Sequence, residues 1–196
     1  MKRALFIISI LLLSAFTSGT LKRQIKVVIS PESKISINGK TNINRFNCSF
    51  DAINLKSPVS VLVEIIDGDL YFEDTNLLLN TNCFDCGNRQ MNSEFKDLLN
   101  AKAFPNIILK LKKLEIDNFD GNDATTYMDI YIAGVKKSYT VPISLIGTKE
   151  MIIKGKLNLN ICDFNLEPPK KMMGLVVVDE IIQINIELII KEYSFQ

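Results

Sequence analysis

The chain has 196 residues, of which 47% are hydrophobic, and it carries 23 lysine and arginine residues against 22 aspartate and glutamate residues. This near-neutral balance gives no electrostatic argument for binding to nucleic acids or to anionic membranes. The sequence contains no histidine, which excludes Ser-His-Asp and Cys-His catalysis and removes the most common general base. The length suits one domain with a sizeable core.

The first 19 residues have the three-part pattern of a secretory signal peptide. Lys2 and Arg3 precede an apolar run over residues 4–15, and small or hydroxylated residues follow at 17–20. The run is shorter than the about 20 residues that span a bilayer, so cleavage is favoured over a retained membrane anchor. We therefore expect a single mature domain over residues 20–196, in the periplasm or secreted from the cell.

Apolar and polar residues alternate with a period of two along most of the remaining chain, which predicts β-strands. Strands are predicted near residues 25–29, 34–38, 46–50, 59–66, 107–112, 127–132, 139–145, 156–161 and 182–190. Each has one apolar and one mainly polar face, which is typical of antiparallel strands that cover a core on one side. Periodicity alone does not choose between a sandwich and a closed barrel.

One segment has helical spacing instead. Apolar residues recur three and four positions apart from Met91 to Leu99. Asn92 or Ser93 is expected as the N-cap, and Pro105 lies just beyond the end. The sequence thus predicts an all-β, antiparallel fold with one short helix.

No grouping of residues indicates a catalytic or metal site. The segment 117–123 carries three aspartates and a glycine, but it lacks the terminal glutamate of a calcium loop. It lies between two predicted strands, where a hairpin turn is the stronger interpretation. We expect no enzyme activity, no metal and no cofactor.

Four cysteines, Cys48, Cys83, Cys86 and Cys162, suggest one or two disulfides in an exported protein. A four-thiolate zinc site and redox chemistry at the Cys83-x-x-Cys86 pair are the alternatives. A Cys83–Cys86 bond is disfavoured, because three steps along a strand cover about 10 Å, whereas a disulfide needs Cα atoms about 4.4–6.8 Å apart. We favour Cys48–Cys86 together with Cys83–Cys162.

Four stretches in order resemble the YceI-like polyisoprenoid-binding family. They are the strand-turn-strand opening at 36–46, the helix with its Phe-Pro-x-Ile strand entry at 92–107, the Gly-Val-x-Lys hairpin at 132–143, and the acidic start of the last strand at 178–184. The four cysteines depart from the common pattern of the family, as does the missing histidine near Asn44.

The resemblance implies a lipocalin-like β-barrel whose apolar interior holds an isoprenoid lipid, such as a polyprenyl carrier or a quinone tail. The alternative is a solid-core envelope or secreted protein that binds another protein through its surface. The resemblance also allows transient membrane contact and a homodimer, and it implies no nucleic-acid partner. From the alternating faces, the ligand-binding residues are expected to be Phe46, Phe50, Phe95, Ile130, Leu157, Leu159, Ile184 and Ile186.

Overall fold

The computed structural model describes residues 21–55, 57–117, 122–147, 150–171 and 175–193, and the expected signal peptide lies outside them. Within these ranges the strands are β1 (Leu21–Ile29), β2 (Lys34–Lys40), β3 (Arg45–Phe50), β4 (Val59–Ile66), β5 (Asp69–Asn80), β6 (Phe84–Asp85), β7 (Asn106–Ile116), β8 (Asp123–Ile132), β9 (Val135–Ile146), β10 (Met151–Asn160), β11 (Lys170–Lys171), β12 (Val176–Val177) and β13 (Ile181–Tyr193). The helices are α2 (Arg89–Leu98) and the short 3-10 turns η2 (Ala52–Asn54), η3 (Thr81–Cys83) and η4 (Ile161–Phe164). No helix of this described part is long and apolar enough to span a bilayer.

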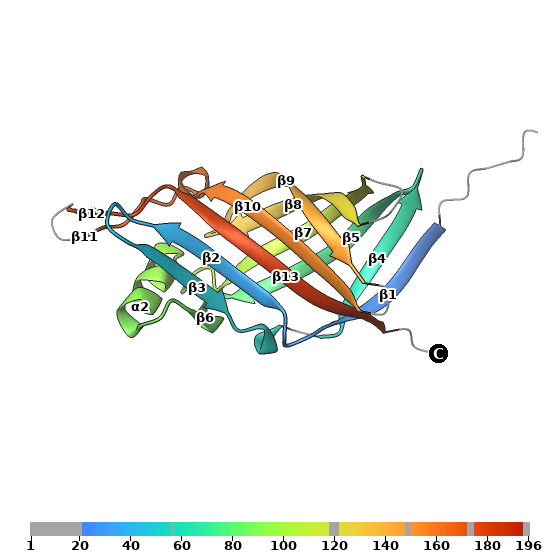
Figure 1. Cartoon of the computed structure of the whole chain (residues 1–196), viewed down its shortest axis with the longest axis horizontal. Coiled ribbons are helices and arrows are strands. Elements are labelled where there is room, and N and C mark those ends of the chain that lie inside the picture. Colours follow the sequence, from blue (N-terminus) through green and yellow to red (C-terminus); the bar gives the residue numbers. More distant parts are fainter. Residues whose placement is uncertain (1–20, 56, 118–121, 148–149, 172–174, 194–196) are drawn as a thin grey trace, which may run out of the picture.

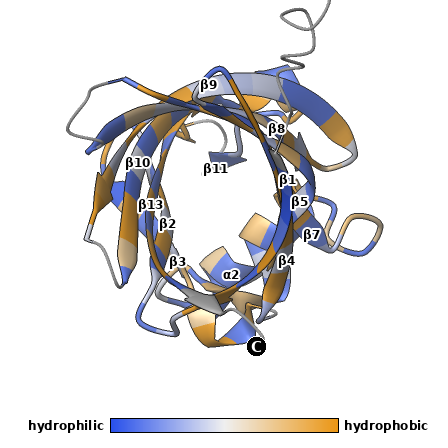
Figure 2. Cartoon of the chain, turned by 90° about the vertical axis from the view of Figure 1, so that its right-hand side faces the viewer, coloured by the Kyte–Doolittle hydropathy of each residue, from blue (hydrophilic) through white to orange (hydrophobic). Residues whose placement is uncertain are grey.

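Among the described residues, eight strands form a closed antiparallel ring in the order β1–β4–β5–β7–β8–β9–β10–β13. The ring closes because Lys26–Ile29 of β1 pair with Ile190–Tyr193 of β13. Figure 2 looks along the axis of this ring, with α2 and β11 at its far end. The predicted all-β barrel is confirmed.

Strand β13 has a second neighbour on the edge where it meets β1. Its residues Gln183–Glu187 pair with Lys34–Asn38 of β2, and β3 and β6 continue the sheet beyond β2. Strand β5 runs through η3 directly into β6, and a disulfide joins Cys48 of β3 to Cys86 just after β6. At the α2 end of the molecule (Figure 1), the chain from β5 through η3 to β6 and the Cys48–Cys86 disulfide thus connect β5 with β3.

The apolar faces of the strands point inward and form the main core. The most deeply buried large apolar side chains, Phe164, Ile35, Ile130 and Leu159, are at most 1% exposed. Burying a side chain of this size contributes roughly 1.5–3 kcal/mol, which is why the alternating strands turn these faces to one side.

Helix α2 begins earlier than predicted. Asn88 is its N-cap, since the Asn88 side chain accepts a hydrogen bond from the backbone N–H of Met91 at 2.9 Å. Asn92, the predicted cap, lies inside the helix. Its side-chain oxygen accepts a hydrogen bond from the N–H of Cys86 at 2.6 Å, and its amide donates to Asp85 at 3.1 Å. Asn92 therefore ties the helix to the end of β6.

The predicted turn at 117–123 is a hairpin connection. Strands β7 and β8 pair antiparallel on either side of it, and the N–H of Asp117 donates to the carbonyl oxygen of Asp123 at 3.0 Å. Residues 118–121 of this segment lie outside the described ranges.

Candidate ligand-binding site

The interior of the barrel is hollow. The helix-end cavity, of about 260 Å³, lies between α2 and the strands and is bordered by Phe46, Phe95 and Ile107. The mid-barrel cavity, of about 270 Å³, is bordered by Val61 and Leu188 among others. An engineered apolar cavity of about 150 Å³ already binds benzene, so each of these is large enough for part of an apolar ligand.

One face of β13 runs along both cavities. Ile182 and Ile184 line the helix-end cavity, and Ile184, Ile186, Leu188 and Ile190 line the mid-barrel cavity. Ile184 borders both, so the two cavities are neighbours at this residue. At about 3.4 Å per residue, the path from Ile182 to Ile190 is about 27 Å long. The two apolar cavities thus follow one another along β13.

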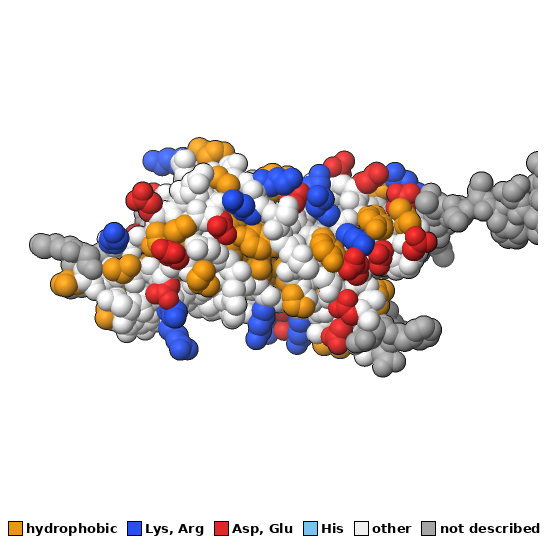
Figure 3. Space-filling model, turned by 90° about the horizontal axis from the view of Figure 1, so that it is seen from above, with side chains coloured by type: hydrophobic (Ala, Val, Ile, Leu, Met, Phe, Trp, Pro, Cys, Tyr) orange, Lys and Arg blue, Asp and Glu red, His pale blue; other side chains and the backbone are white. Residues whose placement is uncertain are grey.

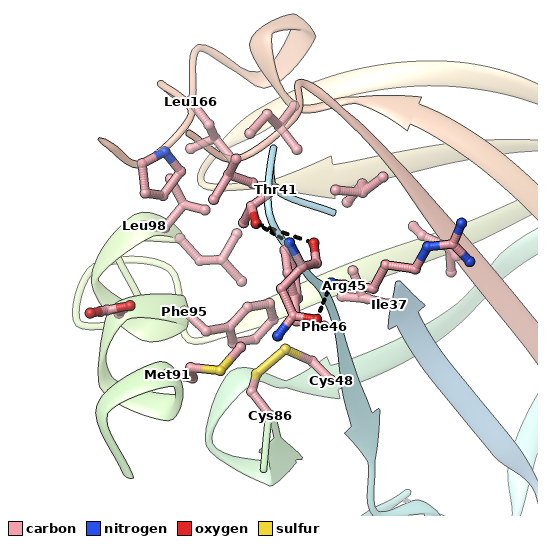
Figure 4. Close-up of a pocket in the computed structure, with 18 of the residues that line it drawn as sticks. Ile37, Thr41, Arg45, Phe46, Cys48, Cys86, Met91, Phe95, Leu98 and Leu166 are labelled. Atoms are coloured by element: carbon pink, nitrogen blue, oxygen red, sulfur yellow. Dashed lines mark hydrogen bonds between the residues drawn. A yellow bond between two sulfur atoms is a disulfide. The ribbon is translucent and has the colours of Figure 1, made fainter. Parts of the chain in front are cut away.

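Aromatic and sulfur-containing side chains form the wall of the helix-end cavity under α2. Figure 4 shows Met91 and Phe95 of α2 directed toward Phe46 and the disulfide. The ring of Phe46 lies over Gly39 of β2, where a Cβ atom would stand 2.2 Å from the ring. Gly39 therefore provides the space that lets Phe46 turn into the cavity wall.

Polar residues gather where the helix-end cavity opens. Thr41, Asn44, Arg45 and Glu94 line this mouth. The Thr41 hydroxyl accepts a hydrogen bond from the N–H of Asn44 at 2.9 Å and donates to its carbonyl oxygen at 3.1 Å, which fixes the turn between β2 and β3. The Arg45 side chain extends away from Phe95 and Met91 (Figure 4).

The mid-barrel cavity is almost entirely apolar, and no titratable side chain of the described residues lines it. Its polar residues use their donors on the wall itself: Thr126 donates to the carbonyl oxygen of Lys113 at 3.3 Å, and Asn76 donates to that of Asp74 at 3.3 Å. Nearby, the buried Tyr139 hydroxyl has no hydrogen-bond partner among the described residues, and burial raises its pKa. Tyr139 is therefore neutral at ordinary pH.

Six of the eight predicted ligand-binding residues line the cavities, namely Phe46 and Phe95 at the helix end, Ile130, Leu157 and Ile186 in mid-barrel, and Ile184 in both. Phe50 and Leu159 line neither cavity. Phe50 packs against Phe84, with ring centroids 5.0 Å apart, and Leu159 is buried in the packed core. Alternation identifies the inward face but not which inward residue borders open space.

Other lining residues were not singled out from the sequence. Val27 and Leu109 lie on the apolar faces of predicted strands, so the alternation could have identified them as lining residues. Leu77 belongs to β5, which was not predicted as a strand. Ile43 lines the mouth from a turn, where periodicity carries no information, and Arg45 is the first residue of β3, one position before the predicted strand.

The cysteines form one bridge. Cys48 and Cys86 are bonded, as favoured from the sequence, whereas Cys83 and Cys162 are free thiols. The predicted Cys83–Cys162 bond is thus wrong for this structure, because Cys83 packs against the core while Cys162 is exposed. A bonded Cys48–Cys86 pair also excludes a zinc site that needs all four thiolates.

Comparison with solved structures identifies several similar folds. BcnA of Burkholderia cenocepacia is 17% identical with a TM-score of 0.61, over 81% of this chain and 96% of that chain. A polyisoprenoid-binding domain from Saccharophagus degradans, implicated in plant cell wall breakdown, is 10% identical with a TM-score of 0.60, over 85% and 98%. The YceI protein of Campylobacter jejuni is 17% identical with a TM-score of 0.54, over 71% and 83%.

A comparison with curated protein sequences finds no match to this chain. At the identities above, the solved structures support the fold alone. A family model of the YceI-like domain matches residues 28–190, which extend from β1 to β13 and include most of the residues that line the two cavities. The chain therefore belongs to the YceI-like domain family.

Proposed function

We propose that the protein binds an isoprenoid lipid in its two cavities and sequesters or carries it without catalysing a reaction. The observation that carries this proposal is the pair of apolar cavities that follow one another along β13 and share Ile184 in their linings. Family membership and the polyisoprenoid-binding domain among the similar structures support the choice of ligand class.

The energetics favour a long hydrocarbon chain. Each methylene group moved from water into an apolar interior contributes about 0.8 kcal/mol, so such a ligand needs few polar contacts. The mid-barrel cavity suits the chain, because no titratable described residue lines it. The polar mouth beside Arg45 suits a head group, and it supports a binding mode with the head of the lipid at the α2 end.

We further propose that the protein acts in the periplasm or after secretion. Two observations support this location: the signal-peptide pattern of residues 1–19 and the Cys48–Cys86 disulfide, a bond that persists in oxidising compartments. A homodimer stays a prediction from the resemblance.

The test is organic extraction of the purified protein followed by mass spectrometry, with and without incubation with a polyprenol. We expect the wild-type protein to retain a polyprenyl species. Replacement of Ile184 by Phe fills the junction of the cavities and should reduce the retained lipid at least about tenfold. Ile181→Phe is the matched control, because Ile181 lies on the same strand but is 50% exposed and lines neither cavity.

Repeated empty extracts from folded wild-type protein, before and after incubation with the polyprenol, would contradict the proposal. That result would favour the alternative, a secreted or envelope protein that acts through its outer surface. Equal retention by Ile184→Phe and wild type would show that the lipid is bound elsewhere than in the joined cavities.

A further inference from the structure

Two solvent-exposed aliphatic side chains lie at the mouth of the helix-end cavity. Ile43, in the turn between β2 and β3, and Leu175, just before β12, are each 72% exposed, which makes them the most exposed large hydrophobic side chains of the described residues. Ile43 lines the mouth itself, and Val176, next to Leu175, lines it too. The apolar interior thus continues onto the surface at this end.

The two turns that carry these side chains are held together. The Asn42 side chain donates to the carbonyl oxygen of Leu175 at 2.8 Å and accepts from the N–H of Val177 at 3.1 Å. The N–H of Asn42 donates to the carbonyl oxygen of Val177 at 3.2 Å, and Thr41 bridges to Val178. The turn that carries Ile43 and the segment that carries Leu175 are therefore held together as one rim.

Cationic side chains flank this rim. Arg45 follows Ile43 closely in the chain, and Lys170 pairs across the β11–β12 hairpin with Val177. Both are exposed, and neither forms an ion pair with any residue that the structure describes. Figure 3 shows apolar side chains together with basic and acidic ones at this end.

We propose that the rim formed by Ile43, Arg45, Lys170 and Leu175 docks on a phospholipid bilayer. The helix-end cavity then opens toward the acyl chains, and the ligand passes between bilayer and barrel without crossing water. This inference rests on the proposed function, because it explains how an isoprenoid reaches the cavity.

The shape and charge of the rim fit a bilayer better than a protein partner. A stable protein interface buries more than about 1,000 Å² with a complementary surface. Here the apolar group consists of two turn tips, which suit shallow insertion of about 5–10 Å at the boundary of head groups and acyl chains. Arg45 and Lys170 then lie at the level of the lipid phosphates, where a basic side chain is attracted to anionic lipids.

The chain contains no tryptophan, so a single introduced tryptophan reports insertion directly. The reporter is Leu175→Trp, with Ile43→Trp as a second reporter. The matched control is Ile65→Trp, since Ile65 is 41% exposed near the β4–β5 turn, at the end of the barrel opposite α2 (Figure 1). Each full-length protein is mixed with vesicles of phosphatidylcholine and phosphatidylglycerol whose acyl chains are brominated.

We expect vesicles to shift the tryptophan emission of the Leu175→Trp and Ile43→Trp proteins to shorter wavelength and the bromines to quench it, while the emission of the Ile65→Trp protein is unaffected. Adding Ile43→Asp to the Leu175→Trp protein should weaken vesicle binding about tenfold, equivalent to about 1.4 kcal/mol. Quenching that is absent at both reporter positions, or equal at position 65, would overturn the proposal. The vesicles contain no isoprenoid, so this outcome is separate from the extraction result that tests the proposed function.

Discussion

Asp129 is a carboxylate in the wall of the barrel that is only 2% exposed. It lies on β8 between two residues that line the mid-barrel cavity, so its own side chain turns outward. The Ser138 hydroxyl donates to it at 2.6 Å, and the ammonium groups of Lys136 and Lys112 lie 2.9 and 3.7 Å away. The hydrogen bond from Ser138, followed by that from Lys136, holds the pKa of Asp129 below its ordinary value.

Replacement of Asp129 by Asn should lower the free energy of unfolding at pH 7 by about 1.5–3 kcal/mol, the range for hydrogen bonds to a charged group. Because the pKa is lower in the folded state, ionised Asp129 stabilises the protein above the unfolded pKa of about 3.9, and this stabilisation is lost as the pH falls through the folded value. Urea unfolding should therefore show a large difference between wild type and variant at pH 7 and a small one at pH 3.

The control for this measurement is Asp74→Asn. The Asp74 side chain is 94% exposed, and its ion pair with Lys110 at 3.4 Å lies at the surface, so the change should stay within about 0.5 kcal/mol. An Asp129→Asn difference that is the same at pH 3 and pH 7 would show that packing, and not charge, accounts for it.

Alternation correctly predicts that Asp129 faces outward, yet it does not predict its burial. The groups that surround it come from β7 and β9, and they meet it only once the strand register is set. The same limit applies to Phe50 and Leu159, whose inward direction was predicted but whose distance from the cavities depends on residues far away in the chain.

Helix α2 is the element that separates the helix-end cavity from the outside, and the Cys48–Cys86 bond lies beside it. The bond joins residues 38 positions apart, and Asn92 of the helix is hydrogen-bonded to the N–H of Cys86. The disulfide therefore anchors the helix as well as the wall. Closing a loop of this length is worth about 4 kcal/mol in the chain-entropy model.

Removal of this bond in a Cys48→Ala/Cys86→Ala protein should lower the free energy of unfolding by about 2–5 kcal/mol, and dithiothreitol should lower that of the wild type but not that of the variant. Urea unfolding with and without dithiothreitol measures both. Cys83→Ser and Cys162→Ser are the controls, and each should keep the response to dithiothreitol. Non-reducing peptide mapping that recovers Cys83 linked to Cys162 would contradict this arrangement.

Most elements follow from the sequence, and the exceptions have physical causes. Alternation does not reveal strand β5 for two reasons. Leu77, Leu78 and Leu79 are consecutive, and a shift in register between Tyr71 and Thr75 interrupts the alternation. Strands β6, β11 and β12 have two residues each, too few for any period to show. The N-cap of α2 was misplaced because three asparagine or serine residues stand close together, and only tertiary contacts assign their roles.

The whole molecule departs from ordinary protein interiors, which are packed about as densely as organic crystals. The two cavities leave their linings without partner atoms on one side, so the empty barrel forgoes dispersion contacts that a bound chain would restore. Ligand binding should therefore also raise the free energy of unfolding of the protein.

Polyprenol at about 100 times its Kd should add about 2.7 kcal/mol to the stability of the delipidated protein. For a domain of this size that corresponds to a rise in Tm of about 5–10 °C. Circular dichroism during heating measures the shift. Ile184→Phe should shift little, and Ile181→Phe as much as wild type. An equal rise for Ile184→Phe would place the lipid outside the joined cavities.

The barrel and the sandwich were equally compatible with periodicity because they differ in one long-range pairing. That pairing is β1 with β13, which joins Lys26 to Tyr193. No local pattern encodes it, and in the sequence only the resemblance to a family pointed to closure.

The pairing of β1 with β13 also has a consequence for folding. The first described strand completes the ring only with the last, and β13 is also the hydrogen-bonded neighbour of β2 and β10. Such contacts between distant segments give a high contact order, for which folding takes milliseconds to seconds rather than microseconds. Until β13 arrives, β1, β2 and β10 each present an unpaired edge that can pair with another chain. Pairing of β13 thus removes three exposed strand edges at once, and with them sites of aggregation.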